Sequence, residues 1–206
     1  MSVDYKLGKK KLPHYRTVGS YNSAPYNERS LEVSLGIDFL NTFGEQECLE
    51  VGAVMPYYGY TNHSVVDAHD SHGGCIKEDA LFYDYSNKNV LCLSTVEHMG
   101  NPANIAHYRT SSSTDTDQRP DSGLIFLKKV IKESSTYLIT APVGYYLFFD
   151  ELLEKNNLVD DAIIMKRDAR NVWSVDPQKD LSNYYAKTFN NANSVYIITN
   201  IPDYHD

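Results

Sequence analysis

The chain has 206 residues and a formal net charge of −8, from 27 acidic and 19 basic residues. This acidic balance argues against a general nucleic-acid-binding protein. Its three cysteines share no CxxC spacing, which predicts free thiols rather than a disulfide framework. There is no run of about eighteen apolar residues and no apolar signal-peptide core near Met1. We therefore expect a cytoplasmic or virion protein that is neither transmembrane nor secreted by a signal peptide.

The first thirty residues differ in charge from the rest. Six basic and two acidic residues give this segment a net charge of +4, so the remainder carries −12. Tyrosines are interleaved and aliphatic residues are sparse, so the segment cannot bury enough apolar surface to fold alone. We predict an extended basic, tyrosine-rich arm over residues 1–30 and a single globular β-rich domain over residues 31–206. The residues expected to contact neighbouring subunits are Lys9, Lys10, Lys11, Tyr15, Tyr21 and Tyr26.

After the arm, the sequence up to residue 96 shows mainly patterns typical of β-strands. Apolar and polar side chains alternate over residues 31–39, which predicts a half-buried strand. Residues 48–55 predict a second strand, which Pro56 ends because proline cannot donate to a ladder. Residues 80–85 and 90–96 flank a short polar turn and predict a β-hairpin.

Residues 123–155 carry the strongest structural signal. Two apolar runs, 124–133 and 136–140, flank a serine pair and predict a second hairpin. After Gly144 the apolar residues fall three or four apart, which predicts a helix over residues 145–155 that covers the hairpin. Residues 161–166 and 171–175 indicate another hairpin. A helix over residues 178–190 and a strand over residues 195–199 follow.

These patterns together predict an α+β fold that is predominantly β. We expect an antiparallel sandwich or curved sheet built from hairpins, with two helices packed on it. The expected core residues are Leu31, Val33, Leu35, Ile37, Leu91, Leu93, Ile125, Leu127, Tyr137, Ile139, Phe148, Leu152, Ile163, Trp173 and Ile197.

One polar loop, residues 61–74, groups imidazoles with carboxylates, which are ligands for a transition metal. Its candidate residues are His63, Asp67, His69, Asp70 and His72. The run from Ala68 to Gly74 resembles the histidine-rich loop of metallo-β-lactamase-type hydrolases, although Ser71 stands where that family has an aspartate. One alternative hypothesis is therefore a metal-dependent hydrolase that uses this loop, with His63, His69 and His72 as the metal ligands. Outside this alternative we expect no cofactor.

A second motif, Ser-Thr-Val-Glu-His, spans Ser94 to His98. It is similar to a motif of the zinc deacetylase of lipid A synthesis, in which the histidine is a metal ligand and the glutamate a general base. That resemblance would give those roles to His98 and Glu97. In the family the motif opens a helix, whereas Gly100 and Pro102 predict that no helix follows here.

No coherent active site emerges, so the leading hypothesis is a non-enzymatic structural subunit of a larger assembly. A virion or phage capsid, neck or tail component fits an arm opposite in charge to its body and an excess of tyrosine, 17 residues, because tyrosine is enriched at protein interfaces. Deleting residues 1–28 should then abolish assembly, measured as native mass by light scattering, and leave the fold intact. A further alternative is a monomeric inhibitor or adaptor that binds a basic protein surface.

Overall fold

A computed structural model describes residues 4–15, 27–70, 74–101, 119–170, 172–179, 181 and 192–205. Its centre is a mixed sheet with the strand order β4-β3-β5-β6-β9-β7-β8. The predicted α+β fold, with helices packed against a sheet, is confirmed. Among the described residues, every helix is too short or too polar to span a bilayer.

The first four strands of that order run parallel. They are β4 (Ser64–Val66), β3 (Cys48–Val51), β5 (Asn89–Leu93) and β6 (Thr136–Pro142). Leu49 pairs with Val90, and Val90 pairs with Tyr137, so the ladders are in parallel register across the middle of the sheet. The prediction of an antiparallel sheet built from hairpins was wrong for this half.

The other half of the sheet is antiparallel. Strand β9 (Ser194–Thr199) lies between β6 and β7 (Ile163–Arg167) and runs against both. Strand β7 therefore points the same way as β6. At the edge, β7 pairs with β8 (Trp173–Val175), which confirms the hairpin predicted near residues 161–175.

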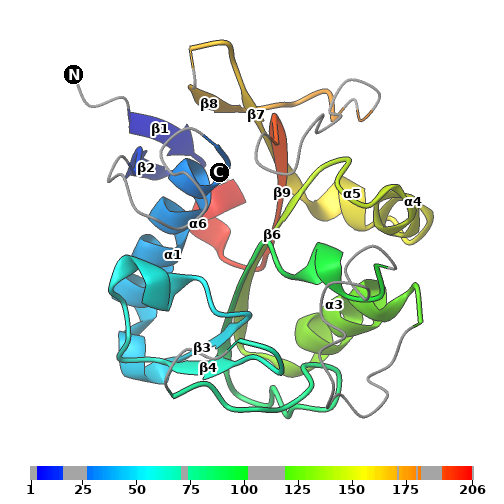
Figure 1. Cartoon of the computed structure of the whole chain (residues 1–206). Coiled ribbons are helices and arrows are strands. Elements are labelled where there is room, and N and C mark those ends of the chain that lie inside the picture. Colours follow the sequence, from blue (N-terminus) through cyan, green and yellow to red (C-terminus); the bar gives the residue numbers. More distant parts are fainter. Residues whose placement is uncertain are drawn as a thin grey trace.

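One face of the sheet, here called the α3 face, carries an apolar core. It is covered by α3 (Ser122–Glu133), α4 (Leu147–Lys155) and α5 (Leu158–Asp161), as Figure 1 shows. Helix α3 contributes Phe126, Leu127 and Val130 to this core, and α4 contributes Phe149 and Leu153. The helix predicted over residues 145–155 is confirmed, but Phe148 is 39% exposed and its neighbour Phe149 is buried instead.

The opposite face, here called the α1 face, is covered by α1 (Arg29–Phe43), a hairpin of β1 (Asp4–Leu7) and β2 (Lys10–Pro13), and α6 (Pro202–His205). The hairpin buries three apolar side chains, Tyr5, Leu7 and Leu12, in the same core as α1. Deleting residues 1–28 would remove these side chains, so we now expect the deletion to weaken the fold as well.

Two predicted strands are helices. Every residue of α1 from Arg29 to Gly36 is buried, because the hairpin covers one side of the helix and the sheet the other. A helix covered all round loses its 3.6-residue hydrophobic stripe, and the sequence over residues 31–39 then mimicked a strand. The apolar run at residues 124–133 fits either period, and tertiary packing makes it α3.

The other predicted strands, the predicted core residues and the last predicted helix differ in outcome. Residues 80–85 form turns rather than a strand, while β3, β5, β6 and β9 confirm strands that the sequence predicted. Nine of the fifteen predicted core residues are buried, and the six exceptions are Ile37, Ile125, Tyr137, Phe148, Leu152 and Ile163. The helix predicted over residues 178–190 lies largely outside the described residues. Short 3-10 helices lie on either side of β3, as η1 (Glu45–Glu47) and η2 (Met55–Tyr58), and after β5, as η3 (Val96–His98).

Candidate functional site at the carboxyl ends of the parallel strands

The strand order reverses between β3 and β5. From β3 the chain moves outward to β4, then returns to β5 on the other side of β3. In open sheets of parallel strands, such a reversal leaves a crevice at the carboxyl ends of the strands, and ligands bind there. A ligand site is therefore expected at the residues that follow β3, β4, β5 and β6.

The segment after β3 makes a tight turn close to β5. Gly52 has φ +80°, a conformation that favours glycine, and a Cβ atom there would clash with the side chain of Thr95. The backbone amides of Val54 and Met55 both donate to Oε1 of Glu50, at 3.1 and 2.9 Å. The Glu50 side chain is fully buried, and its other oxygen lies 2.8 Å from His63 Nε2. This internal carboxylate fixes the turn.

An aspartate stands at the end of the neighbouring strand β4. Asp67 Oδ2 accepts a hydrogen bond from the amide of Ala53 at 3.1 Å, which joins the β3 and β4 ends. Asp67 Oδ1 accepts from the amides of His69 and Asp70. A carboxylate has about four acceptor positions, and this half-buried side chain retains capacity for a ligand hydroxyl.

The ends of β5 and β6 carry a buried polar network. Glu32 of α1 accepts hydrogen bonds from Ser94 Oγ at 2.5 Å and Thr140 Oγ1 at 2.6 Å. Its other oxygen pairs with Arg29 at 2.9 Å, and both of these side chains are at most 5% exposed. Ser94 has φ +40°, which is unusual for a residue other than glycine. Such backbone strain concentrates at functional sites.

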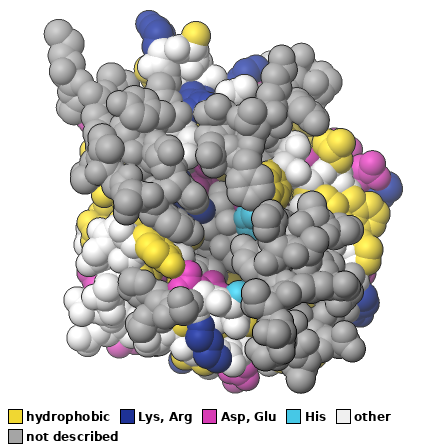
Figure 2. All heavy atoms as spheres, viewed as in Figure 1, with side chains coloured by type: hydrophobic (Ala, Val, Ile, Leu, Met, Phe, Trp, Pro, Cys, Tyr) yellow, Lys and Arg dark blue, Asp and Glu magenta, His cyan; other side chains and the backbone are white. Residues whose placement is uncertain are grey.

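Two more carboxyls belong to this region. Glu97 of η3 is 1% exposed, and burial raises its pKa well above the usual range, with the charge of Glu32 acting in the same direction. Glu28 is 8% exposed, and burial followed by the charge of Glu32 raises its pKa too. Figure 2 shows acidic and histidine side chains close together near the centre of the face seen in Figure 1.

The base of the N-terminal hairpin also reaches this end of the sheet. Tyr15 donates its amide to the Ser30 carbonyl at the start of α1. Its ring meets that of Tyr58 edge to face, with centroids 5.4 Å apart. A residue predicted to contact another subunit thus lies beside the segment that follows β3.

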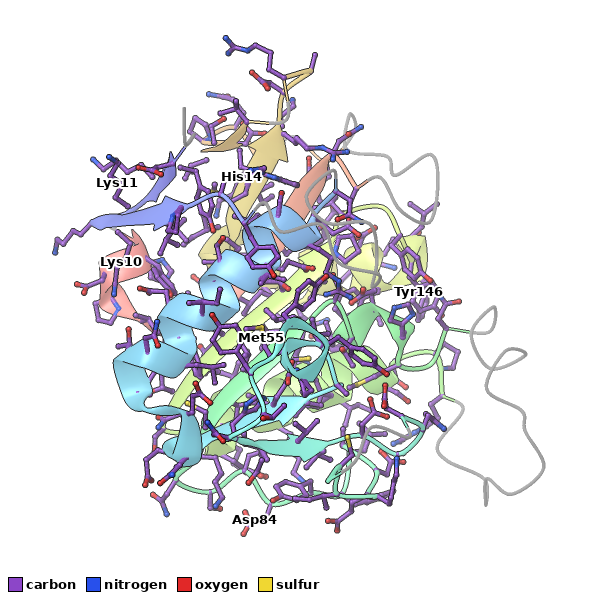
Figure 3. All side chains as sticks on the ribbon, turned by 60° about the vertical axis from the view of Figure 1, so that its left-hand side comes forward. Lys10, Lys11, His14, Met55, Asp84 and Tyr146 are labelled. Carbon is purple, nitrogen blue, oxygen red and sulfur yellow. The ribbon has the colours of Figure 1, made fainter. Side chains whose placement is uncertain are left out.

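The other residues predicted to bind a partner lie apart from this site. Lys10 pairs with Asp38 at 3.2 Å and Lys11 with Asp4 at 3.0 Å, both within the chain, while Lys9 is exposed. Figure 3 shows Lys10 and Lys11 on the hairpin, on the opposite side of the molecule from Tyr146. Tyr21 and Tyr26 lie outside the described residues. A role of this surface in assembly stays a prediction.

The predicted metal loop is divided by strand β4. His63 precedes the strand and is buried against Glu50, whereas His69 follows it and is exposed. His72 lies outside the described residues. Within the described parts of the chain, no three His, Cys, Asp or Glu side chains are grouped as metal ligands. The hydrolase alternative therefore gains no support here.

Sequence reasoning found Asp67, Glu97 and Ser94 through motifs, but for other chemistry. It missed Glu28, Glu32, Glu50 and Gly52, which lie at the start of α1 and at the end of β3. The sequence does contain a signal for the strand ends that form this site, because Gly52 and Asp67 each directly follow a short apolar strand segment. Comparison with protein-family models, with curated proteins and with solved structures gave no significant match.

Proposed function

We propose that the protein is an enzyme that binds S-adenosylmethionine at the carboxyl ends of β3 and β4 and transfers its methyl group. One observation carries the proposal. The turn at Gly52 is hydrogen-bonded to Asp67 and packs against Thr95 after β5, at the point where the strand order reverses. In doubly wound folds, an acidic residue near this position binds the ribose hydroxyls of an adenosine-containing cofactor. Asp67 takes that role in the proposal.

The same turn argues against a cofactor bound through its phosphates. Phosphate-binding loops offer free backbone amides at the start of a helix. Here the amides of Val54 and Met55 already donate to the Glu50 carboxylate, which would also repel a phosphate. Nearby Glu97 and Glu28 add acidic groups and no phosphate-binding charge. A nucleoside without phosphates and with a positively charged sulfur suits these residues better than NAD or ATP.

The strand directions support the same class by analogy. A parallel sheet whose last strand is inserted antiparallel, as β9 is between β6 and β7, is the arrangement of S-adenosylmethionine-dependent methyltransferases. Fold analogy alone does not establish an activity, so the argument depends on the Gly52 turn and Asp67. When bound, S-adenosylmethionine supplies an electrophilic methyl group.

Isothermal titration of the full chain with S-adenosylmethionine, S-adenosylhomocysteine, ATP and NAD⁺ tests the proposal. We expect saturable binding of the first two ligands and none of the last two. Asp67→Asn should weaken the binding of S-adenosylhomocysteine by about tenfold to a hundredfold, since a hydrogen bond to a charged group contributes about 1.5–3 kcal/mol.

Asp84→Asn is the matched control. Asp84 also accepts a hydrogen bond from a backbone amide in a turn, that of Ser86 at 2.9 Å, but it precedes β5 and so lies toward the amino end of that strand, away from the proposed site. Figure 3 shows Asp84 well away from Met55. The control should bind like the wild type. Absence of binding to both sulfur ligands, or equal affinity of Asp67→Asn and wild type, would refute the proposal.

A further inference from the structure

Three buried carboxyls lie on the β5 side of the proposed cofactor site. They are Glu28, Glu32 and Glu97, with exposed fractions of 8%, 0% and 1%. Glu97 follows Thr95 by two residues, and Thr95 packs directly against Gly52. Glu97 therefore follows closely on a residue that contacts the proposed cofactor segment, and Glu32 accepts a hydrogen bond from Ser94 at the same end of β5.

Glu32 is fully engaged within the protein. One oxygen accepts from Ser94 and Thr140, and the other pairs with Arg29. Buried charges are tolerated when they are paired and hydrogen-bonded in this way. Glu32 thus serves to join α1 to the ends of β5 and β6, and has little left to offer a ligand.

Glu97 is different. Its Oε2 atom is buried, and no hydrogen-bond donor reaches it in the described parts of the chain. Its Oε1 atom lies 3.6 Å from His98 Nε2, which is beyond hydrogen-bond length. A buried carboxyl oxygen without a donor is costly to the fold, and such groups are retained where a ligand completes them.

The surrounding charges favour a cation. Burial raises the pKa of both Glu97 and Glu28, and the Glu32 charge adds to the effect in each case. Arg29 acts in the opposite direction but is already paired with Glu32. A cation placed beside Glu97 would favour the ionised carboxylate, because a nearby opposite charge offsets the effect of burial on its pKa. The ring of Tyr145, which meets His98 edge to face at 5.0 Å, offers an aromatic neighbour on the same side.

We propose that Glu97 is the carboxylate that binds a positively charged amine of the substrate that receives the methyl group. The inference rests on the proposed function and adds the substrate class: an amine, held next to the transferred group by an ion pair that excludes water. Glu28 would contribute to the negative potential, and Glu32 would hold the supporting elements in place.

A pair of ligands tests this without knowledge of the natural acceptor. S-adenosylhomocysteine is uncharged at its thioether, whereas sinefungin carries an ammonium where the transferred methyl group would lie. By isothermal titration of the full chain at pH 8, we expect the wild type to bind sinefungin about tenfold more tightly than S-adenosylhomocysteine, the size of one charge-assisted contact. Glu97→Gln should lose this preference and bind S-adenosylhomocysteine as before.

Glu47→Gln, at an exposed position before β3, is the control and should keep the preference. A second measurement needs no variant. In the wild type, the preference for sinefungin should grow as the pH rises, because a protonated Glu97 cannot form the ion pair, and the other titratable or charged groups nearby are Glu28, Glu32, Arg29 and His98. A preference that is absent, independent of pH, or retained in Glu97→Gln would overturn the inference. Failure to bind S-adenosylhomocysteine at all would instead remove the proposed function on which it rests.

Discussion

On the α3 face of the sheet, the buried side chains are almost all apolar, with Phe126, Leu127, Val130 and Phe149 at the centre. On the α1 face, the apolar core is interrupted by buried ionisable side chains, among them the pair Arg29 and Glu32 and the pair Glu50 and His63. Apolar side chains can be buried without a specific partner, whereas burial of a charge costs free energy unless the charge is paired and hydrogen-bonded. The contrast indicates that the α3 face serves stability, and the buried polar network of the α1 face would also organise the proposed ligand site.

The largest expected effect belongs to the α3 face. Phe126→Ala removes a completely buried ring from the α3 core and should lower the free energy of unfolding by about 3–5 kcal/mol. Urea unfolding followed by circular dichroism measures this change. Phe82→Ala is the matched control, because Phe82 is 72% exposed, and should stay within about 0.5 kcal/mol. Equal effects of the two variants would contradict the assignment of the core.

Arg29→Met tests the polar network of the α1 face. It leaves the Glu32 carboxylate buried without its ion-pair partner, so we expect a loss of about 3 kcal/mol in the free energy of unfolding. The exposed pair of Arg170 with Asp168, at 2.9 Å, provides the comparison. Arg170→Met should cost less than about 1 kcal/mol in the same urea assay. A similarly small loss for Arg29→Met would mean that the network is not needed for the fold.

A buried acid on the α3 face gives a pH-dependent test. Burial raises the pKa of Asp150 from 3.8 to about 7, despite the hydrogen bond from the Gly144 amide. Between about pH 4 and pH 7 the folded state keeps a proton that the unfolded state has lost, so wild-type stability should fall as the pH rises through this window. Urea midpoints measured from pH 4 to pH 8 give the slope.

Asp150→Asn should abolish that part of the slope and gain stability relative to wild type as the pH rises. Glu151→Gln, at an exposed position on the same helix α4, is the control and should retain the wild-type slope. If the Asp150→Asn profile stays parallel to that of wild type, Asp150 does not carry the raised pKa.

The smallest effect is expected at the hairpin surface. Lys10 pairs with Asp38 at 3.2 Å, and both side chains are partly exposed, at 26% and 21%. Lys10→Ala should therefore change the free energy of unfolding by less than about 1 kcal/mol, and the difference should shrink further in high salt. A loss above about 2 kcal/mol would show that the hairpin is held by charge rather than by its buried apolar side chains.

Local pattern in the sequence determined much of the sheet. Short apolar segments bounded by glycine, proline or asparagine predicted β3, β5, β6 and β9, and the three-to-four spacing after Gly144 predicted α4. The strand segments are recognisable as short apolar runs because β3 and β9 are buried along their whole length, whereas α4 shows a helical spacing because it has one buried side. The polar loop over residues 61–74 drew attention to Asp67, and a motif similarity drew attention to Ser94–His98, although both were assigned to metal chemistry.

Only the tertiary structure decided the identity of α1 and α3 and the direction of the strands. Helix α1 is enclosed by the hairpin and the sheet, so its sequence shows no exposed stripe from which a period could be read. Parallel strand pairing brings Gly52 close to Thr95, and packing of α1 on the sheet brings Glu32 to Thr140, although both pairs are far apart in the chain. The site consists of such long-range contacts, and local periodicity carries no information about which strand ends will meet.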